Sequence, residues 1–217
     1  MAPIGRAMTV HETRFHGRGG QGVVTAAELL AVAAFQEGRH AQAFPSFGSE
    51  RTGAPVVSFC RIDDRPIRTR EPISAPDVVI IVDPTLLHHV EVFSGLRPGS
   101  QVLVNSSRSA EELGLGDLCA SHRVDRVQVV PATELARTYL GRPLPNAALL
   151  GALAAMTGIV AVASVAAAIS QRFGGEVGQA NVRAAYAAAE LVPPSSGRVA
   201  RVQPPRRPVP TSEVSHA

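Results

Sequence analysis

The chain has 217 residues, of which 45% are hydrophobic, enough to bury one sizeable core, and it carries a formal net charge of +3. Four arginines against one glutamate in residues 194–217 account for the whole positive excess, which argues against a basic nucleic-acid-binding face on the folded part. Lysine is absent, and Cys60 and Cys119 are far apart without a C-x-x-C motif, which excludes a Schiff-base or P-loop lysine, an iron–sulfur cluster and a structural zinc site within this chain.

Segments with the character of strands alternate with helical ones along most of the chain. The run 77–83 is rich in β-branched residues without alternation, which is typical of a strand buried on both faces. The segments 40–44 and 54–62 have no helix-length stretch between them and are predicted to be antiparallel neighbours. The other expected strands are 10–15, 101–104 and 126–130; the expected helices are 21–37, 146–156, 164–172 and 176–190, with further helix starts at Asp83, at the capping-box pattern Ser109 to Glu112, and at Pro131.

This order of elements predicts an α/β layered domain with a helical C-terminal third. We expect a flexible N-terminus over 1–9, a single domain over 10–192, and a disordered Pro/Arg-rich tail over 193–217. Residues 143–171 lack charge, but the break at Thr157-Gly158 and an N-cap at Ser164 favour two short buried helices over a membrane span. No signal peptide is apparent at the N-terminus, so the expected location is the cytoplasm.

A loop with four glycines joins the first strand to the first helix. Free N–H groups and the positive end of the helix dipole favour an anion there, and glycines allow its close approach. The spacing of Gly17, Gly19 and Gly22 also fits the dinucleotide fingerprint G-x-G-x-x-G, but the acidic residue expected about 20 positions later is missing. A tight turn with close helix-on-sheet packing and no ligand is the third interpretation.

A second loop follows the strand 40–44, and small and polar residues surround the pair Glu50-Arg51 in it. If the strands 10–15 and 40–44 are parallel neighbours joined by the apolar helix, both loops open at the same edge of the sheet. Arg18 and Arg51 are then placed to clamp a phosphate or a partner's carboxylate. Salt bridges within the loops, with no ligand, are an equally acceptable interpretation.

No autonomous catalytic or metal-binding set is apparent in the sequence. His88 and His89 are adjacent on an expected helix and point about 100° apart, so they do not form a two-histidine metal face. His16 has no assignable nucleophile or acid partner and is interpreted as structural. Glu28 is more readily explained by a structural hydrogen bond than by a buried functional acid, and Cys60 by a buried, inert thiol.

Taken together, several segments resemble one known family. They are the glycine loop 17–22 with the helix 25–31, the loop 42–55, the strand-to-helix join 83–87, and the segments 146–153 and 157–160. In this order they resemble the gamma subunit of pyruvate:ferredoxin oxidoreductases and related 2-oxoacid:acceptor oxidoreductases, over about residues 10–190. The resemblance implies a three-layer α/β/α fold with a mixed, mostly parallel sheet.

The resemblance also implies a subunit that is inactive alone. The family's complex converts a 2-oxoacid and coenzyme A into acyl-CoA, carbon dioxide and reduced ferredoxin. Thiamine diphosphate with Mg²⁺ lies between its alpha and beta subunits, and its [4Fe-4S] clusters lie in the beta and delta subunits. Alpha, beta and delta subunits, or fused equivalents, are therefore the expected partners, with ferredoxin reached through the complex and neither nucleic acid nor membrane involved.

For this chain the resemblance implies candidate coenzyme A or interface loops, with no catalytic residue and no metal ligand of its own. The candidate residues are Gly17, Arg18, Gly19, Gly20, Gln21 and Gly22 in the first loop, and Ser46, Glu50, Arg51, Thr52 and Gly53 in the second. Two alternatives remain open at this point. One is a gamma-type subunit acting with a 2-oxoisovalerate or aryl-2-oxoacid enzyme, and the other is a standalone nucleotide-binding regulatory module.

Overall fold

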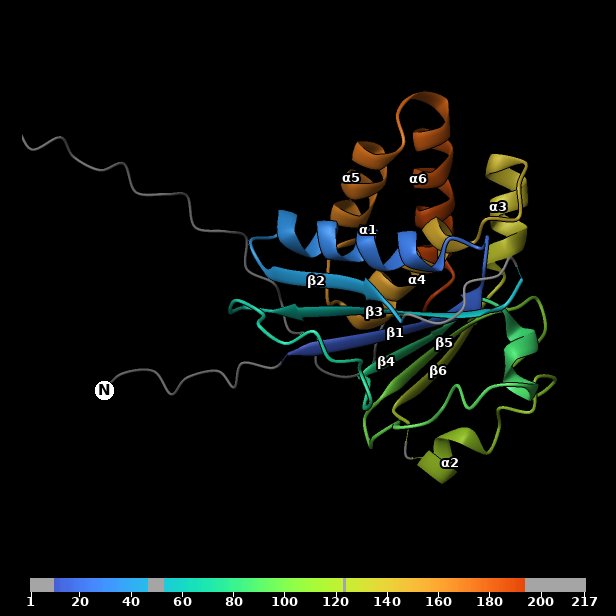
Figure 1. Ribbon diagram of the computed structural model, residues 1–217. Helices are drawn as coiled ribbons and strands as arrows, with labels where there is room; N and C mark the ends of the chain where they lie inside the picture. Colours follow the sequence, from blue (N-terminus) through green and yellow to red (C-terminus); the bar gives the residue numbers. More distant parts are fainter. Residues whose placement is uncertain (1–9, 47–52, 123, 194–217) are drawn as a thin grey trace, which may run out of the picture.

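A computed structural model describes residues 10–46, 53–122 and 124–193, which fold around one mixed sheet (Figure 1). Its six strands are β1 (His11–Arg18), β2 (His40–Pro45), β3 (Pro55–Asp63), β4 (Val78–Ile81), β5 (Gln101–Asn105) and β6 (Arg126–Val130). Their order across the sheet is β2-β3-β1-β4-β5-β6. β1, β4, β5 and β6 are parallel, whereas β3 runs antiparallel between β2 and β1.

Helices cover the two faces of the sheet unequally. The helical segments are α1 (Val23–Gln36), the 3-10 helix η1 (Pro84–His88), α2 (Leu118–His122), α3 (Ala132–Leu140), α4 (Asn146–Thr157), α5 (Val162–Arg172) and α6 (Gly175–Glu190). Figure 1 shows α1 and α3 to α6 above the sheet and α2 below it. A smaller apolar cluster that includes Leu86, Val92 and Leu118 packs below against β4 and β5. The three-layer α/β fold is thus confirmed, with a thin lower layer.

The upper core is centred on α4, which is buried along almost its whole length. Its residues pack between the sheet, α1 and α6, and α6 lies especially close at Gly151. A Cβ on Gly151 would lie well inside the contact distance of the carbonyl oxygen of Ala185 on α6. A glycine is therefore required here by the separation of the two helices and not by the backbone conformation.

Because α4 and α6 lie so close at Gly151, adding a single methyl group there is expected to destabilise the fold. Gly151→Ala is expected to lower the free energy of unfolding by about 1–3 kcal/mol, because α6 must move away from α4. Gly116→Ala is the matched control, since a Cβ on Gly116 meets no atom within 4 Å. Urea unfolding of the two variants measures the difference. Equal stability of the two variants would contradict the packing described here.

Buried arginines fasten coil segments to the lower face of β1 and β3. The guanidinium of Arg14 donates to the carbonyl oxygens of Ile73, Val92 and Ser94, and the residue is only 7% exposed. Arg61 pairs with Glu12 at 2.8 Å and also donates to backbone carbonyls of the segment 69–71. Charged side chains here take the place of a covering helix, by satisfying carbonyls that have no secondary-structure partner.

Several elements match the sequence-based predictions closely. β2 and β3 are antiparallel neighbours, and β4 is completely buried on both faces. Gly158 ends α4 in the left-handed conformation with φ of 64°. Asp83 caps the helix that follows it, with its side chain accepting from the N–H of Thr85, although that helix is a 3-10 helix. Within the described residues, none of the helices is both long and apolar enough to cross a bilayer.

Other predictions were wrong. β1 and β2 are not neighbours, because β3 lies between them, although β1 and β2 run in the same direction. Ser109 and Glu112 do exchange the two capping-box hydrogen bonds, but the turn stops at Gly114, whose φ is 70°. Ser164 is not an N-cap, since α5 begins two residues earlier.

One further side chain differs from what was expected of it. Glu28 is exposed on the outer surface of α1, so it is neither a buried acid nor a core hydrogen-bonding group.

The start of α5 is held by a tertiary contact and not by Ser164. The N–H of Ala161 donates to Glu37 at 2.7 Å. A local capping signal at Ser164 was therefore overridden by Glu37, which lies 124 positions before Ala161 in the chain.

Candidate functional site at the carboxyl edge of the sheet

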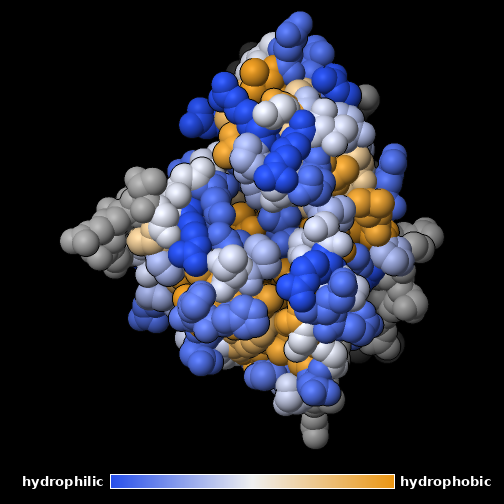
Figure 2. Space-filling model, turned by 90° about the vertical axis from the view of Figure 1, so that its right-hand side faces the viewer, coloured by the Kyte–Doolittle hydropathy of each residue, from blue (hydrophilic) through white to orange (hydrophobic). Residues whose placement is uncertain are grey.

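The connections that follow β1 and β4 lie on opposite faces of the sheet. These adjacent strands are parallel, but β1 continues into α1 above the sheet whereas β4 continues into η1 below it. Ligands of open α/β sheets usually bind where consecutive connections diverge in this way, outside the carboxyl ends of the strands. Figure 2 views the molecule from this edge, where hydrophilic residues surround smaller apolar patches.

Three positions of the first loop require glycine for steric reasons. Gly17 is still part of β1, and a Cβ there would lie 2.5 Å from Val23 Cγ2 and 3.1 Å from Val82 Cβ. Gly20 and Gly22 have φ of 92° and 75°, a region that L side chains rarely adopt. Close packing and a tight turn therefore explain these three glycines, whether or not the loop also binds a ligand.

An ion pair joins the glycine loop to the end of β4. Arg18 Nε lies 3.2 Å from Asp83 Oδ2, and Gln21 Nε2 donates to the same oxygen at 2.8 Å. Gln21 Oε1 in turn accepts from the N–H of Arg18 at 2.8 Å. Thr85 donates to the other carboxylate oxygen, Oδ1, from both its N–H and its hydroxyl. A carboxylate of this chain is thus already paired with the glycine loop.

These contacts control the protonation of Asp83. Burial by itself would raise the pKa of the carboxyl, but the hydrogen bonds from Thr85 and Gln21 and the charge of Arg18 outweigh it and lower the pKa below its ordinary value. The carboxylate is therefore ionised at neutral pH, and it balances the charge of Arg18.

The second loop meets the first at this edge. The N–H of Gly19 donates to the carbonyl of Ala54 at 3.0 Å, and Arg18 Nη1 donates to the carbonyl of Gly53 at 3.0 Å. At the other end of the loop, the N–H of Ser46 donates to Val57 on β3. The structure therefore brings Ser46 and Gly53 to the same edge as the glycine loop, as predicted. The remaining candidates of this loop, Glu50, Arg51 and Thr52, lie outside the described residues.

Two polar residues at this edge, Asn105 and Asn146, were not predicted from the sequence. Asn105, at the end of β5, donates to Val82 O and Thr133 Oγ1 and accepts from the N–H of Thr133. Asn146, the first residue of α4, is 7% exposed and lies against Gly22, where a Cβ would come within 2.8 Å of its Nδ2. An asparagine at the carboxyl end of a parallel strand was a usable signal for Asn105, whereas only the tertiary structure places Asn146 beside the loop.

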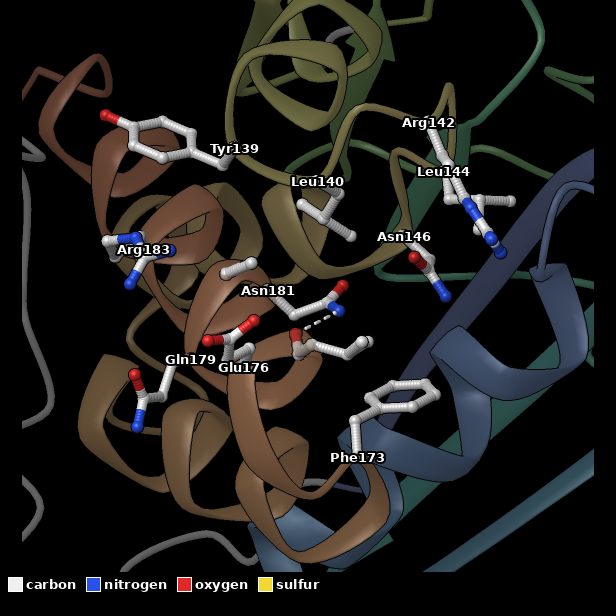
Figure 3. Close-up of a pocket in the computed structure, with 12 residues that line it drawn as sticks. Tyr139, Leu140, Arg142, Leu144, Asn146, Phe173, Glu176, Gln179, Asn181 and Arg183 are labelled. Atoms are coloured by element: carbon white, nitrogen blue, oxygen red, sulfur yellow. Dashed lines mark hydrogen bonds between the residues drawn. The ribbon is translucent and has the colours of Figure 1, made fainter.

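A groove opens next to Asn146, between α3, α4 and α6 (Figure 3). Its volume is about 650 Å³, and its lining mixes apolar side chains such as Leu140 and Phe173 with charged ones such as Arg142 and Arg183. In Figure 3, Asn181 lies within it and donates to the carbonyl of Val177 at 2.8 Å. The candidate edge thus extends from the glycine loop toward α6.

Two other titratable groups considered from the sequence are buried. His16 lies at the end of β1, is 5% exposed, and neither ring nitrogen has a hydrogen-bond partner in the described part of the chain. Burial, together with the charge of Arg14, lowers the pKa of His16 to about 4. Cys60 is a buried core residue, as predicted, and burial raises the pKa of its thiol far above its ordinary range. The described residues hold no group of three His, Cys, Asp or Glu side chains suited to a metal ion.

The sequence and the fold are similar to those of characterised proteins. The chain is 51% identical over 179 residues to the common gamma subunit of the pyruvate/ketoisovalerate oxidoreductases of Thermococcus litoralis, covering 82% of this chain and 95% of that protein. It is 46% identical over 181 residues to pyruvate synthase subunit PorC of Methanothermobacter thermautotrophicus, covering 83% and 95%. The crystal structure of the pyruvate oxidoreductase subunit PORC of Thermotoga maritima has a TM-score of 0.72 at 37% identity, covering 83% of this chain and 96% of that one.

The sequence profile described as pyruvate ferredoxin/flavodoxin oxidoreductase matches residues 12–191, almost the same span as the β1-to-α6 domain. Both loops of the candidate edge fall inside this span. The chain therefore belongs to the pyruvate ferredoxin/flavodoxin oxidoreductase family.

Proposed function

We propose that the chain is the gamma subunit of a multi-subunit pyruvate:ferredoxin oxidoreductase, which oxidatively decarboxylates a 2-oxoacid to acyl-CoA with reduction of ferredoxin. The observation that carries this proposal is the 51% identity to a gamma subunit of which the chain covers 95%. Two separate cysteines cannot hold an iron–sulfur cluster, so the electron-transfer groups must come from partner chains.

The proposed partners are alpha, beta and delta subunits or fused equivalents, with thiamine diphosphate, Mg²⁺ and [4Fe-4S] clusters held by those chains. A cytoplasmic location, testable by cell fractionation, belongs to the same proposal. Within the complex, we assign the glycine loop and the loop from Ser46 to Gly53 to the surface that contacts the partner subunits or coenzyme A. Their shared position at the switch between β1 and β4 supports this assignment.

The residues at this edge fit coenzyme A in part. Phosphate and amide oxygens need N–H donors, which the first turn of α1 supplies from its backbone and Asn146 from its side chain. Gly20 and Gly22 leave the loop backbone without side chains at these points. Arg18, by contrast, is already paired with Asp83. When bound, coenzyme A would supply the thiol that accepts the acyl group.

Anaerobic affinity purification of the tagged chain from its native host tests the proposal. We expect thiamine- and cluster-bearing chains to co-purify, and the preparation to reduce a dye only when both pyruvate and coenzyme A are present. A chain that purifies alone and binds a nucleotide would contradict the proposal and favour the regulatory module. A complex that prefers 2-oxoisovalerate or an aryl 2-oxoacid to pyruvate would keep the subunit assignment and change only the substrate.

Substitution of Arg51 distinguishes the two roles proposed for the second loop, coenzyme A binding and subunit contact. Arg51→Ala removes a cation capable of a charge-assisted hydrogen bond, so about a tenfold or greater loss of acyl-CoA formation is expected. If the complex remains assembled in size-exclusion chromatography, the loss is one of coenzyme A binding. If the gamma subunit dissociates, the loop is a subunit contact. Normal assembly with normal turnover would contradict both roles.

A further inference from the structure

We infer that Arg18 is a positioning residue that joins the two loops, and that the anion it binds is Asp83 of the same chain. This inference deepens the proposed function, on which its kinetic test rests. An arginine in a glycine-rich loop at a ligand-binding edge is otherwise expected to bind a phosphate or carboxylate from outside. The contacts of its guanidinium group decide between these roles.

Each nitrogen of the Arg18 guanidinium contacts a different residue. Nε pairs with the carboxylate of Asp83 at 3.2 Å, Nη2 donates to the hydroxyl of Thr85 at 2.9 Å, and Nη1 donates to the carbonyl of Gly53 at 3.0 Å. These partners come from the end of β4, from η1 and from the end of the second loop. One side chain thus connects the glycine loop to two segments that are distant from it in sequence, the turn at 83–85 and the end of the second loop.

The acceptors of this network are satisfied as well. The hydroxyl of Thr85 accepts from Arg18 and donates to Asp83 Oδ1 at 2.6 Å, while Gln21 Nε2 donates to Oδ2. The side chain of Asp83 is 12% exposed and that of Arg18 is 30% exposed, so the pair is partly shielded from water. An external anion would have to compete with an internal carboxylate that accepts four hydrogen bonds or ion-pair contacts.

The backbone shows what the network holds in place. The N–H of Gly19, directly after Arg18, donates to the carbonyl of Ala54, directly after Gly53. The side-chain and main-chain contacts therefore act on the same junction between the loops. Loss of Arg18 is expected to release the end of the second loop while leaving β1 and α1 in the core intact.

The two roles of Arg18 predict opposite effects of Asp83→Asn. If Arg18 binds an external phosphate, loss of the competing charge frees it, and KM for coenzyme A falls. If Arg18 positions the loops, Asp83→Asn breaks the same junction as Arg18→Ala. In that case each variant raises KM for coenzyme A about tenfold in the assembled complex, and the double variant is no worse than either single one, because the residues form one network.

The kinetics of Arg18→Lys and the exchange rate of the Gly19 amide test the positioning role independently. A lysine ammonium cannot reach Asp83, Thr85 and Gly53 together, so we expect an effect close to that of alanine, whereas a phosphate-binding role would tolerate it. Hydrogen–deuterium exchange at the Gly19 amide of the full chain is expected to accelerate about tenfold in Arg18→Ala. Arg137→Ala, which removes an exposed pair with Glu134, is the control and is expected to change neither measurement.

A lower KM for coenzyme A in Asp83→Asn, unchanged Gly19 exchange in Arg18→Ala, or wild-type kinetics in all the variants would each overturn the inference. A wild-type complex without coenzyme A-dependent turnover would contradict the proposed function instead. The exchange measurement does not need turnover and would still test Arg18 in that case.

Discussion

Replacing Arg14 by methionine is expected to lower the free energy of unfolding by about 3–5 kcal/mol, the largest effect of any single substitution considered. The guanidinium is almost fully buried and donates to the carbonyls of Ile73, Val92 and Ser94 beneath β1. Methionine fills most of the volume but donates no hydrogen bond, so carbonyls that have lost their water remain without a partner.

Urea unfolding of the full chain, followed by far-UV circular dichroism, measures this loss as a lower transition midpoint. Arg137→Met is the matched control, because within the described part of the chain the Arg137 side chain makes only an exposed pair with Glu134, and its loss is expected to cost less than about 1 kcal/mol. A midpoint for Arg14→Met equal to that of the control would show that the coil segments do not depend on Arg14.

The second large effect is a loss of stability in mild acid through His16. The pKa of His16 in the folded chain is about 4, below its ordinary value of 6.5, because the ring is buried and Arg14 is near. Between pH 6.5 and 4 the unfolded chain therefore binds more protons at this position than the folded chain does. Above pH 6.5 the protonation of His16 does not reduce the free energy of unfolding. As the pH decreases below 6.5, this group lowers the free energy of unfolding, by about 3 kcal/mol in total at pH 4.

His16→Leu isolates this contribution. An apolar side chain removes a titrating group whose two nitrogens have no partner in the described part of the chain, so stability at pH 7 is expected to be unchanged or higher. The difference in unfolding free energy between pH 7 and pH 5 should shrink by about 2 kcal/mol relative to wild type. An identical pH dependence in wild type and variant would show that His16 is not the responsible group.

The candidate site was only partly predictable from sequence. The glycine-rich loop 17–22 was predictable, because the spacing of its glycines and the apolar helix that follows are local features of the sequence. The partner of Arg18 was not predictable, since Asp83 is 65 positions away and was interpreted only as a helix cap. Asp83 does cap η1, but the antiparallel insertion of β3 and the parallel pairing of β1 with β4 also bring it to Arg18.

The sequence by itself determined most of the elements, although not α2, and also the buried strand β4, the antiparallel pair β2 and β3, the end of α4 at Gly158, and the family. These follow from periodicity, turn chemistry and motif order, which act over a few residues. Only the tertiary structure decided the strand order, the roles of Arg14 and Arg18, and the start of α5. Those depend on which distant groups satisfy buried charges and backbone carbonyls, and local sequence patterns carry no information about such pairings.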